Sequence, residues 1–206
     1  MNICSKGLAR PTFNQNDLTA PESVVARIQR ELDAIRLIDL GARTPLVCQL
    51  TGIDKKIVRR LYRQLTGTSS SPGLTPFTDA WYIQDNRLML HAAVVWKLYR
   101  QTAAFGHSAA RQLIAVFQAY VSLVKKPLLD ISRVHFVRRL ATTQSWQERV
   151  CPECRTYYLA PVERLERPCY GCVLYFEQRC RHCLSIRQHK GRGRPLKHCQ
   201  TCGLIL

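Results

Sequence analysis

The sequence lacks any uninterrupted apolar run longer than a few residues. Because a helix needs roughly 20 apolar residues to span a bilayer, no membrane-spanning segment is expected. The opening stretch, MNICSKGLARPTFNQNDLTAPE, also lacks the apolar core of a signal peptide. These two absences predict a chain that works in the cytoplasm and not in a membrane.

The sequence also lacks the motifs of several enzyme classes. No H-x-E motif accompanies the cysteines, as a zinc deaminase would require. There is no glycine-rich phosphate loop or clear catalytic triad. Redox chemistry at a C-x-x-C pair requires a thioredoxin-like βαβ context, which is missing as well. We therefore do not expect an enzyme.

Acidic residues are scarce. Lys and Arg number 31 against 14 Asp and Glu, so the formal net charge is +17 and the pI is near 9.9. No acidic residue follows Glu177, whereas basic residues accumulate there. A globular chain with this charge requires a polyanion or an acidic protein as partner. A general solubilising charge, the alternative, normally mixes both signs, so the asymmetry favours nucleic acid.

Cysteine, by contrast, is abundant. Eight of the ten cysteines form four C-x-x-C pairs, with 14 residues between the first two pairs and 15 between the last two. This spacing is typical of four-thiolate zinc sites, in which each pair presents two sulfurs to one ion. The predicted ligands are Cys151, Cys154, Cys169 and Cys172 for one Zn²⁺, and Cys180, Cys183, Cys199 and Cys202 for a second.

Two alternatives to eight zinc-bound cysteines exist. A disulfide framework would need an oxidising compartment, whereas the expected cytoplasmic location keeps thiols reduced. At the second site, His182, His189 or His198 could replace a cysteine as ligand. Cys4 and Cys48 lie apart from the pairs and are interpreted as unpaired thiols, Cys48 as a buried one.

Hydrophobic residues make up 46% of the chain, enough for one medium domain with a small appendage. We expect a loose N-terminal arm over 1–18, a helical domain over 19–145 and a zinc-binding module over 146–206. The first 150 residues show no sustained period-2 alternation, so the predicted fold class is mainly α, with a zinc-ribbon-like cysteine-rich module at the C-terminus. Short strands and knuckles are expected there, because zinc rather than a core would hold the module together.

Helical periodicity defines the elements of the helical domain. Thr19 and Glu22 predict a capping box, and an apolar stripe at helical spacing then extends toward Gly41. The stripe comprises Val24, Ile28, Leu32, Ile35 and Ile38. Further helices are predicted over 45–50, 54–66, 87–104, 108–124 and 128–141.

Residues 44–65 have the pattern of a helix-turn-helix unit. Cys48, Gly52 and Val58 stand where such a unit needs a small residue, a turn glycine and an apolar anchor. Basic residues line the second helix, where they would meet guanines or phosphates in the major groove. They are Lys55, Lys56, Arg59, Arg60 and Arg63. The alternative is a helical hairpin with a solvated basic face.

A second basic element lies in the last cysteine loop, HKGRGRPLK over 189–197. An extended backbone with glycine between two arginines can lie in a narrow A·T minor groove. Non-specific phosphate contact is the alternative. The DNA-binding residues predicted here are Arg187, Lys190, Arg192, Arg194 and Lys197.

The stretch from Leu40 to Trp81 resembles the FlhC family of flagellar transcriptional regulators. The shared motifs are LGAR at 40–43, the stretch at 61–81 that ends in FTDAW, and the four cysteines from Cys151 to Cys172. The resemblance covers about residues 20–175. It implies a bacterial cytoplasmic activator that forms a hetero-oligomer with FlhD, binds double-stranded promoter DNA upstream of flagellar genes and acts on RNA polymerase. It also implies that those four cysteines bind zinc.

The chain departs from the family pattern after about residue 176, where the second cysteine set and the basic loop follow. A second zinc site therefore rests on spacing alone. The apolar helices over 87–124 could supply the FlhD interface or fill the core. An RNA-binding zinc-ribbon protein remains the alternative function, because ribbons with basic loops also suit RNA.

Overall fold

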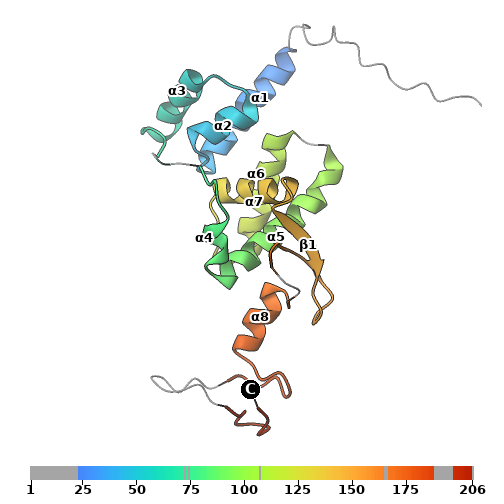
Figure 1. Cartoon of the computed structure of the whole chain (residues 1–206). Helices are drawn as coiled ribbons and strands as arrows, with labels where there is room; N and C mark the ends of the chain where they lie inside the picture. Colours follow the sequence, from blue (N-terminus) through green and yellow to red (C-terminus); the bar gives the residue numbers. More distant parts are fainter. Residues whose placement is uncertain are drawn as a thin grey trace, which may run out of the picture.

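A computed structural model describes residues 23–71, 73, 75–106, 108–164, 167–187 and 197–205. The chain is elongated, with α1–α3 at one end and the last cysteines at the other (Figure 1). Helices dominate, as predicted, and the described strands form one two-stranded hairpin. The predicted arm over 1–18 lies outside the described residues. No helix in the described part is long and apolar enough to cross a membrane.

Helix α1 (Val24–Asp39) begins later than the sequence predicted. Its N-cap is Ser23, whose side chain accepts a hydrogen bond from the Ala26 N–H at 3.1 Å. Thr19 and Glu22, where a capping box was predicted, lie outside the described residues, whereas the helix that the periodicity predicted is present. Gly41, with a φ of 82°, follows the C-cap residue and ends the helix as predicted.

The apolar stripe of α1 is exposed in its first half and packs on the other helices only in its second half. Val24, Ile28 and Leu32 are 63%, 49% and 52% exposed. The buried face instead uses Asp33, Ala34, Leu37 and Ile38. Only the second half of α1 packs on the other helices, so its first turns carry apolar side chains into solvent.

Helices α2 (Thr44–Thr51) and α3 (Lys55–Thr66) form the predicted pair over 44–65. Gly52 lies in the left-handed region with a φ of 69°, which allows the short turn between them. Asp54 caps α3 by accepting a hydrogen bond from the Lys56 N–H at 2.7 Å. Cys48 is half-buried rather than fully buried.

Helix α5 (Asn86–Thr102) is the central element of the helical body. It contacts α4 (Ala80–Ile83), α6 (Ala109–Leu123) and α7 (Ile131–Thr142), and a short 3-10 helix, Ala103–Phe105, follows it. The inner faces of α5 and α6 bury residues such as Met89, Val95, Leu113 and Tyr120 in the hydrophobic core. These faces fill the core, which is one of the two roles that the sequence allowed for the apolar helices over 87–124.

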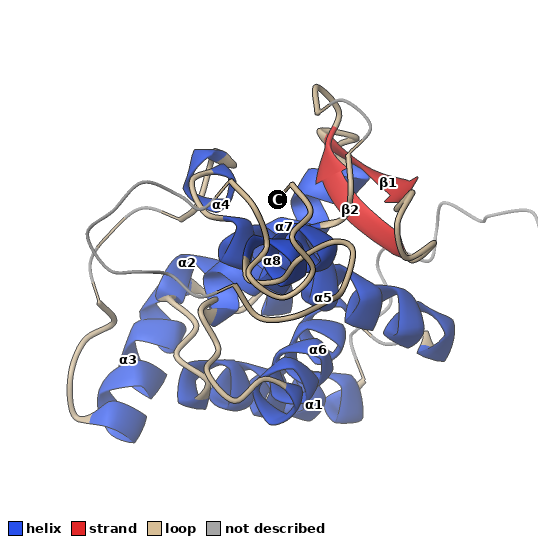
Figure 2. Cartoon of the chain, turned by 90° about the horizontal axis from the view of Figure 1, so that it is seen from below, coloured by secondary structure: helices blue, strands red, loops and turns tan. Residues whose placement is uncertain are grey.

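The hairpin of β1 (Trp146–Val150) and β2 (Tyr157–Pro161) lies to one side of the helices (Figure 2). Trp146 is almost fully buried, and its indole N–H donates to Asp79 Oδ2 at 2.8 Å. Leu159 and Ala160 belong to the same core cluster as the helices. The core therefore continues past residue 145, where the helical domain was expected to end.

Helix α8 (Tyr170–Glu177) follows the hairpin and packs on α5. Its Tyr170 side chain is 1% exposed and contacts the Tyr158 ring edge to face at 5.9 Å between centroids. The sequence was expected to form only strands and knuckles here, so α8 was not predicted. Beyond α8 the chain leaves the body and forms the final cysteine cluster (Figure 1).

Candidate zinc centres and nucleic-acid interface

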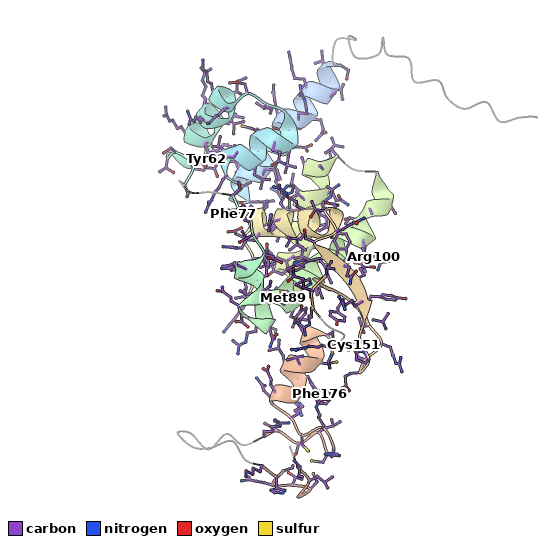
Figure 3. All side chains as sticks on the ribbon, viewed as in Figure 1. Tyr62, Phe77, Met89, Arg100, Cys151 and Phe176 are labelled. Atoms are coloured by element: carbon purple, nitrogen blue, oxygen red, sulfur yellow. The ribbon has the colours of Figure 1, made fainter. Side chains whose placement is uncertain are left out.

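The first cysteine cluster combines a knuckle with a helix end. Cys151 and Cys154 follow strand β1, while Cys169 is the N-cap of α8 and Cys172 lies in its first turn. All four Sγ atoms lie within 4.8 Å of one another. Cys151 Sγ is 3.9 Å from Cys172 Sγ, and Cys154 Sγ is 3.7 Å from Cys169 Sγ. Figure 3 shows Cys151 beside the start of α8.

These sulfur separations fit a zinc tetrahedron. With a Zn–S bond near 2.3 Å, the edge of a regular tetrahedron is about 3.8 Å. A disulfide would need about 2.05 Å, and all eight cysteines of the four pairs are free thiols. The disulfide alternative is therefore excluded for these cysteines in this structure, and the donor set is that of a closed structural zinc site.

The backbone of the first knuckle is shaped to present both sulfurs. The N–H of Arg155 donates to the Cys151 carbonyl at 3.0 Å, and Arg155 itself has a φ of 59°. The Cys169 N–H donates to Cys151 Sγ at 3.1 Å. Such N–H donors stabilise a thiolate, which is the form that binds metal.

The electrostatics of the first cluster favour bound metal. Hydrogen bonds from Thr156 lower the pKa of Cys154 to about 6. Burial raises the pKa of Cys172, and its three neighbouring cysteines raise it further. Four thiolates at this distance repel one another unless a cation lies between them. The cluster therefore suits a divalent ion such as Zn²⁺, with α8 directing its positive N-terminal end toward the sulfurs.

The second cluster consists of two turns of the same kind as the Cys151–Cys154 knuckle, one at each cysteine pair. Cys180 Sγ is 3.7 Å from Cys202 Sγ, and Cys183 Sγ is 3.6 Å from Cys199 Sγ, with all four sulfurs within 4.8 Å. Leu184 and Gly203 take the same left-handed conformation as Arg155, with φ of 58° and 72°. The pairing across 180–202 therefore fits a second zinc ion, as the spacing predicted.

Histidine does not replace cysteine in the described part of this cluster. Neither His182 nor His198 joins the four sulfurs, and His189 lies outside the described residues. His182 instead donates its backbone N–H to Cys180 Sγ at 3.4 Å. Hydrogen bonds led by the one from Ser185 lower the pKa of Cys199 to about 5, which favours the ligand form.

Helix α3 presents the first group of predicted DNA-binding residues. Only Val58 and Tyr62 of this helix are buried, and the Tyr62 hydroxyl donates to the Ala42 carbonyl at 2.7 Å (Figure 3). All five predicted basic residues are exposed: Lys55, Lys56, Arg59, Arg60 and Arg63. The helix therefore rests on a narrow apolar edge and leaves its basic surface in solvent.

The C-terminal basic residues are only partly described. Lys197 is exposed, whereas the Arg187 guanidinium donates to the Arg179 carbonyl at 3.0 Å and thus also holds the knuckle. The other residues predicted in this loop, Lys190, Arg192 and Arg194, lie outside the described residues. The structure therefore places α3 and the second cysteine cluster at opposite ends of the chain rather than on one surface (Figure 1).

Comparison with known proteins gives consistent matches. The family model of the flagellar transcriptional activator FlhC matches residues 20–183. A flagellar transcriptional regulator FlhC from Paraburkholderia atlantica is 28% identical over 150 residues, covering 68% of this chain and 67% of its own length. The Variovorax paradoxus regulator of the same name is 26% identical over 160 residues, covering 74% and 77%.

The family match has a definite end. It includes the whole first cluster and stops at Cys183, so Cys199 and Cys202 lie beyond it. The matched part spans most of the chain and contains the helical body, the β-hairpin and α8. On this evidence the chain belongs to the flagellar transcriptional activator family FlhC.

Proposed function

We propose that this chain is a DNA-binding subunit of a transcriptional activator that acts in the cytoplasm, with FlhD, at promoters of flagellar genes. The observation that carries the proposal is the surface of α3. A helix that buries only Val58 and Tyr62 and exposes five basic side chains is available to a DNA groove. In this proposal α3 contacts the duplex, and RNA polymerase is recruited by the assembled complex.

The zinc clusters would support this activity by holding structure. A four-thiolate site has no open coordination position, so its metal contributes to folding and not to a reaction. The first cluster fixes the hairpin and α8 on the helical body. The second would present the basic residues that flank and follow Arg187, and insertion of this loop into a minor groove remains a proposal from the sequence.

A protein partner is supported by α1. Val24, Val25 and Ile28 form an apolar strip on turns of the helix that no described element covers, with Val25 76% exposed. Exposed apolar strips of this kind mark interaction surfaces. We infer that FlhD packs an apolar helix face on this strip, which would leave α3 free for DNA.

The test is a binding isotherm at fixed salt, with flagellar promoter duplex and scrambled duplex, with and without FlhD. We expect tight binding to the promoter only when FlhD is present, because specificity would need the complete assembly. Equal binding to both duplexes, unaffected by FlhD, would contradict the proposal. Preference for single-stranded RNA over both duplexes would support the RNA-binding alternative instead.

A variant of α1 isolates the role of the partner. Val25→Asp places a charge in the exposed apolar strip without touching the core, so the chain should fold normally. We expect it to lose association with FlhD in size-exclusion chromatography and to lose promoter specificity. The control is Glu31→Lys, a charge change at an exposed position of the same helix, which should affect association far less.

A further inference from the structure

A cleft of about 400 Å³ opens between the start of α2, one face of α3 and the loop that follows α3. Its volume lies within the range of small-ligand pockets. It is distinct from both cysteine clusters. The residues that line it are Thr44, Pro45, Lys55, Arg59, Arg63, Ser69, Ser70, Ser71 and Gly73.

The lining of the cleft is cationic. Lys55, Arg59 and Arg63 follow one another at intervals of four residues, so their side chains share one face of α3. No carboxylate lines the described wall of the cleft. None of the three forms an ion pair with any residue that the structure describes. Three unneutralised cations on one wall attract an anion.

The opposite wall supplies hydroxyl groups. Ser69, Ser70 and Ser71 are contributed by the loop after α3. Ser70 Oγ accepts a hydrogen bond from the Thr44 N–H at 3.2 Å, which fixes this loop against the first residue of α2. The cleft therefore joins cations from one element to neutral donors from another, a combination that suits an anion with several oxygen acceptors.

Thr44 lines the cleft at the first residue of α2. The residue is 5% exposed, and its Oγ1 is buried without a hydrogen-bond partner among the described residues, so this hydroxyl is not a donor that a ligand in the open cleft can reach. Thr44 also begins α2, whose N-cap residue makes no side-chain cap, and Thr44 and Pro45 at this positive helix end both line the cleft.

Arg43 lies against the rim of the cleft. A Cβ placed on Gly73 would lie 2.8 Å from Arg43 Nη1, so the loop and the end of this flexible side chain lie close together. The φ of Gly73 is 129°, a conformation that side-chain-bearing residues rarely adopt. This backbone conformation, rather than the space around residue 73, is what favours glycine in the loop.

We propose that this cleft binds a phosphate group. If this phosphate belongs to the DNA backbone, the inference rests on the proposed function and adds to it the residues that hold the backbone. Lys55, Arg59 and Arg63 then hold the backbone beside α3, while Lys56 and Arg60, which do not line the cleft, remain for the groove. A soluble phosphorylated molecule is the other source of the same chemical group.

The experiment titrates the full zinc-loaded chain with inorganic pyrophosphate by calorimetry, and separately measures affinity for promoter and scrambled duplexes with FlhD present, as the proposed function requires. The cleft variants are Arg59→Ala and Arg63→Ala, and the matched control is Arg60→Ala, which removes one arginine from a neighbouring face of α3. We expect pyrophosphate affinity to fall about 10-fold in both cleft variants and less than about 3-fold in the control. Thermal melting and zinc content of each variant show that it is folded.

The duplex measurements identify the source of the phosphate. If DNA provides it, Arg59→Ala weakens promoter and scrambled duplex alike and reduces the salt slope by about one. If only pyrophosphate binding is lost, the cleft serves a soluble phosphorylated molecule. The proposal is overturned if pyrophosphate fails to bind the wild type at millimolar concentrations, or if all three variants lose affinity equally. If the chain binds pyrophosphate but no DNA, with or without FlhD, the result contradicts the proposed function and leaves the phosphate cleft supported.

Discussion

The two cysteine clusters have the same donor set but differ in what surrounds them. Cys151 is fully buried and belongs to the hydrophobic core together with Tyr158 and Tyr170. Around the second cluster the apolar side chains remain in solvent, and Ile186 and Ile205 are 67% and 73% exposed. The same chemistry therefore adds to a core in one place and replaces a core in the other.

The contacts between the clusters are few and exposed. Arg181 pairs with Glu153 at 2.8 Å, with side chains 52% and 36% exposed, and its guanidinium stacks over Phe176 at 4.7 Å. An exposed ion pair of this kind contributes about 0–1 kcal/mol. The second cluster is consequently expected to fold and unfold with little effect on the helical body.

The largest effect is expected for Cys151→Ala. This change removes a metal ligand that is also a core residue, so hairpin, α8 and the adjacent face of α5 lose support together. The free energy of unfolding of the helical body should fall by about 3 kcal/mol or more. Thermal or urea unfolding followed by circular dichroism measures it. If the helical body of this variant unfolds like the wild type although one zinc ion is missing, the first cluster does not stabilise the body, and the contrast with the second cluster is wrong.

The second cluster provides the counterpart, Cys199→Ala. Zinc content should fall from two ions to one per chain, because three thiolates bind Zn²⁺ far more weakly than four. The unfolding free energy of the helical body should change by less than about 0.5 kcal/mol. A large loss of body stability would contradict the contrast between the clusters. Amide exchange over 180–205 should reveal local unfolding in the same variant.

Much of this contrast could not be read from the sequence. The C-x-x-C spacing predicted both ligand sets, because knuckle geometry depends on residues adjacent in the chain. What packs around each set depends on contacts with distant residues. Tyr170, next to Cys169, pairs with Tyr158 and lies against the body, whereas Ile186 near Cys183 meets no core. Tyr170 and Ile186 are both large apolar residues near a cysteine pair, so the sequence alone does not show which of them is buried.

Helix prediction had a similar limit. The periodicity of Val24, Ile28 and Leu32 identified a helix but not the depth of its burial, since an amphipathic stripe also suits a surface that awaits a partner. Helix α8 was missed because the stretch YGCVLYFE over 170–177 has no amphipathic period and begins with a cysteine cap. The phosphate cleft was invisible because Thr44 and Ser70 are far apart in the sequence.

A smaller effect is expected at the contact between the hairpin and α5. Glu148 accepts a hydrogen bond from the Trp96 indole N–H at 2.6 Å and pairs with Arg100 at 3.1 Å. Glu148→Gln should lower the free energy of unfolding by about 1 kcal/mol, because one charge-assisted contact is weakened and Arg100 is partly solvated. The control is Glu153→Gln, which touches only the link to the second cluster and should cost less than about 0.5 kcal/mol.

The smallest expected effect is the pH dependence of stability, which should involve the helical body and not the second cysteine cluster. Burial lowers the pKa of His91 and His135 below the usual 6.5, and Arg138 and Arg139 lower that of His135 further. The unfolded chain therefore takes up these protons first as pH falls. Stability of the helical body is complete above pH 6.5 and declines below it.

Melting between pH 7.5 and 6.0, with zinc content checked at each point, measures this pH dependence. His135→Gln should flatten the decline, because it removes one of the groups that must stay neutral in the fold. His182→Gln, in the second cluster, should leave the slope unchanged. An equal change in both variants would mean that acid acts through loss of zinc instead.

Helix α3 and the second cluster lie at opposite ends of the elongated chain (Figure 1). A single chain that touches DNA with both ends must leave the duplex between them uncovered. Hydroxyl-radical footprints would then show two protected windows rather than one. The helical phase of the windows would be fixed by the rigid body between them, so inserting about five base pairs, roughly half a turn, should disrupt binding more than inserting a full turn.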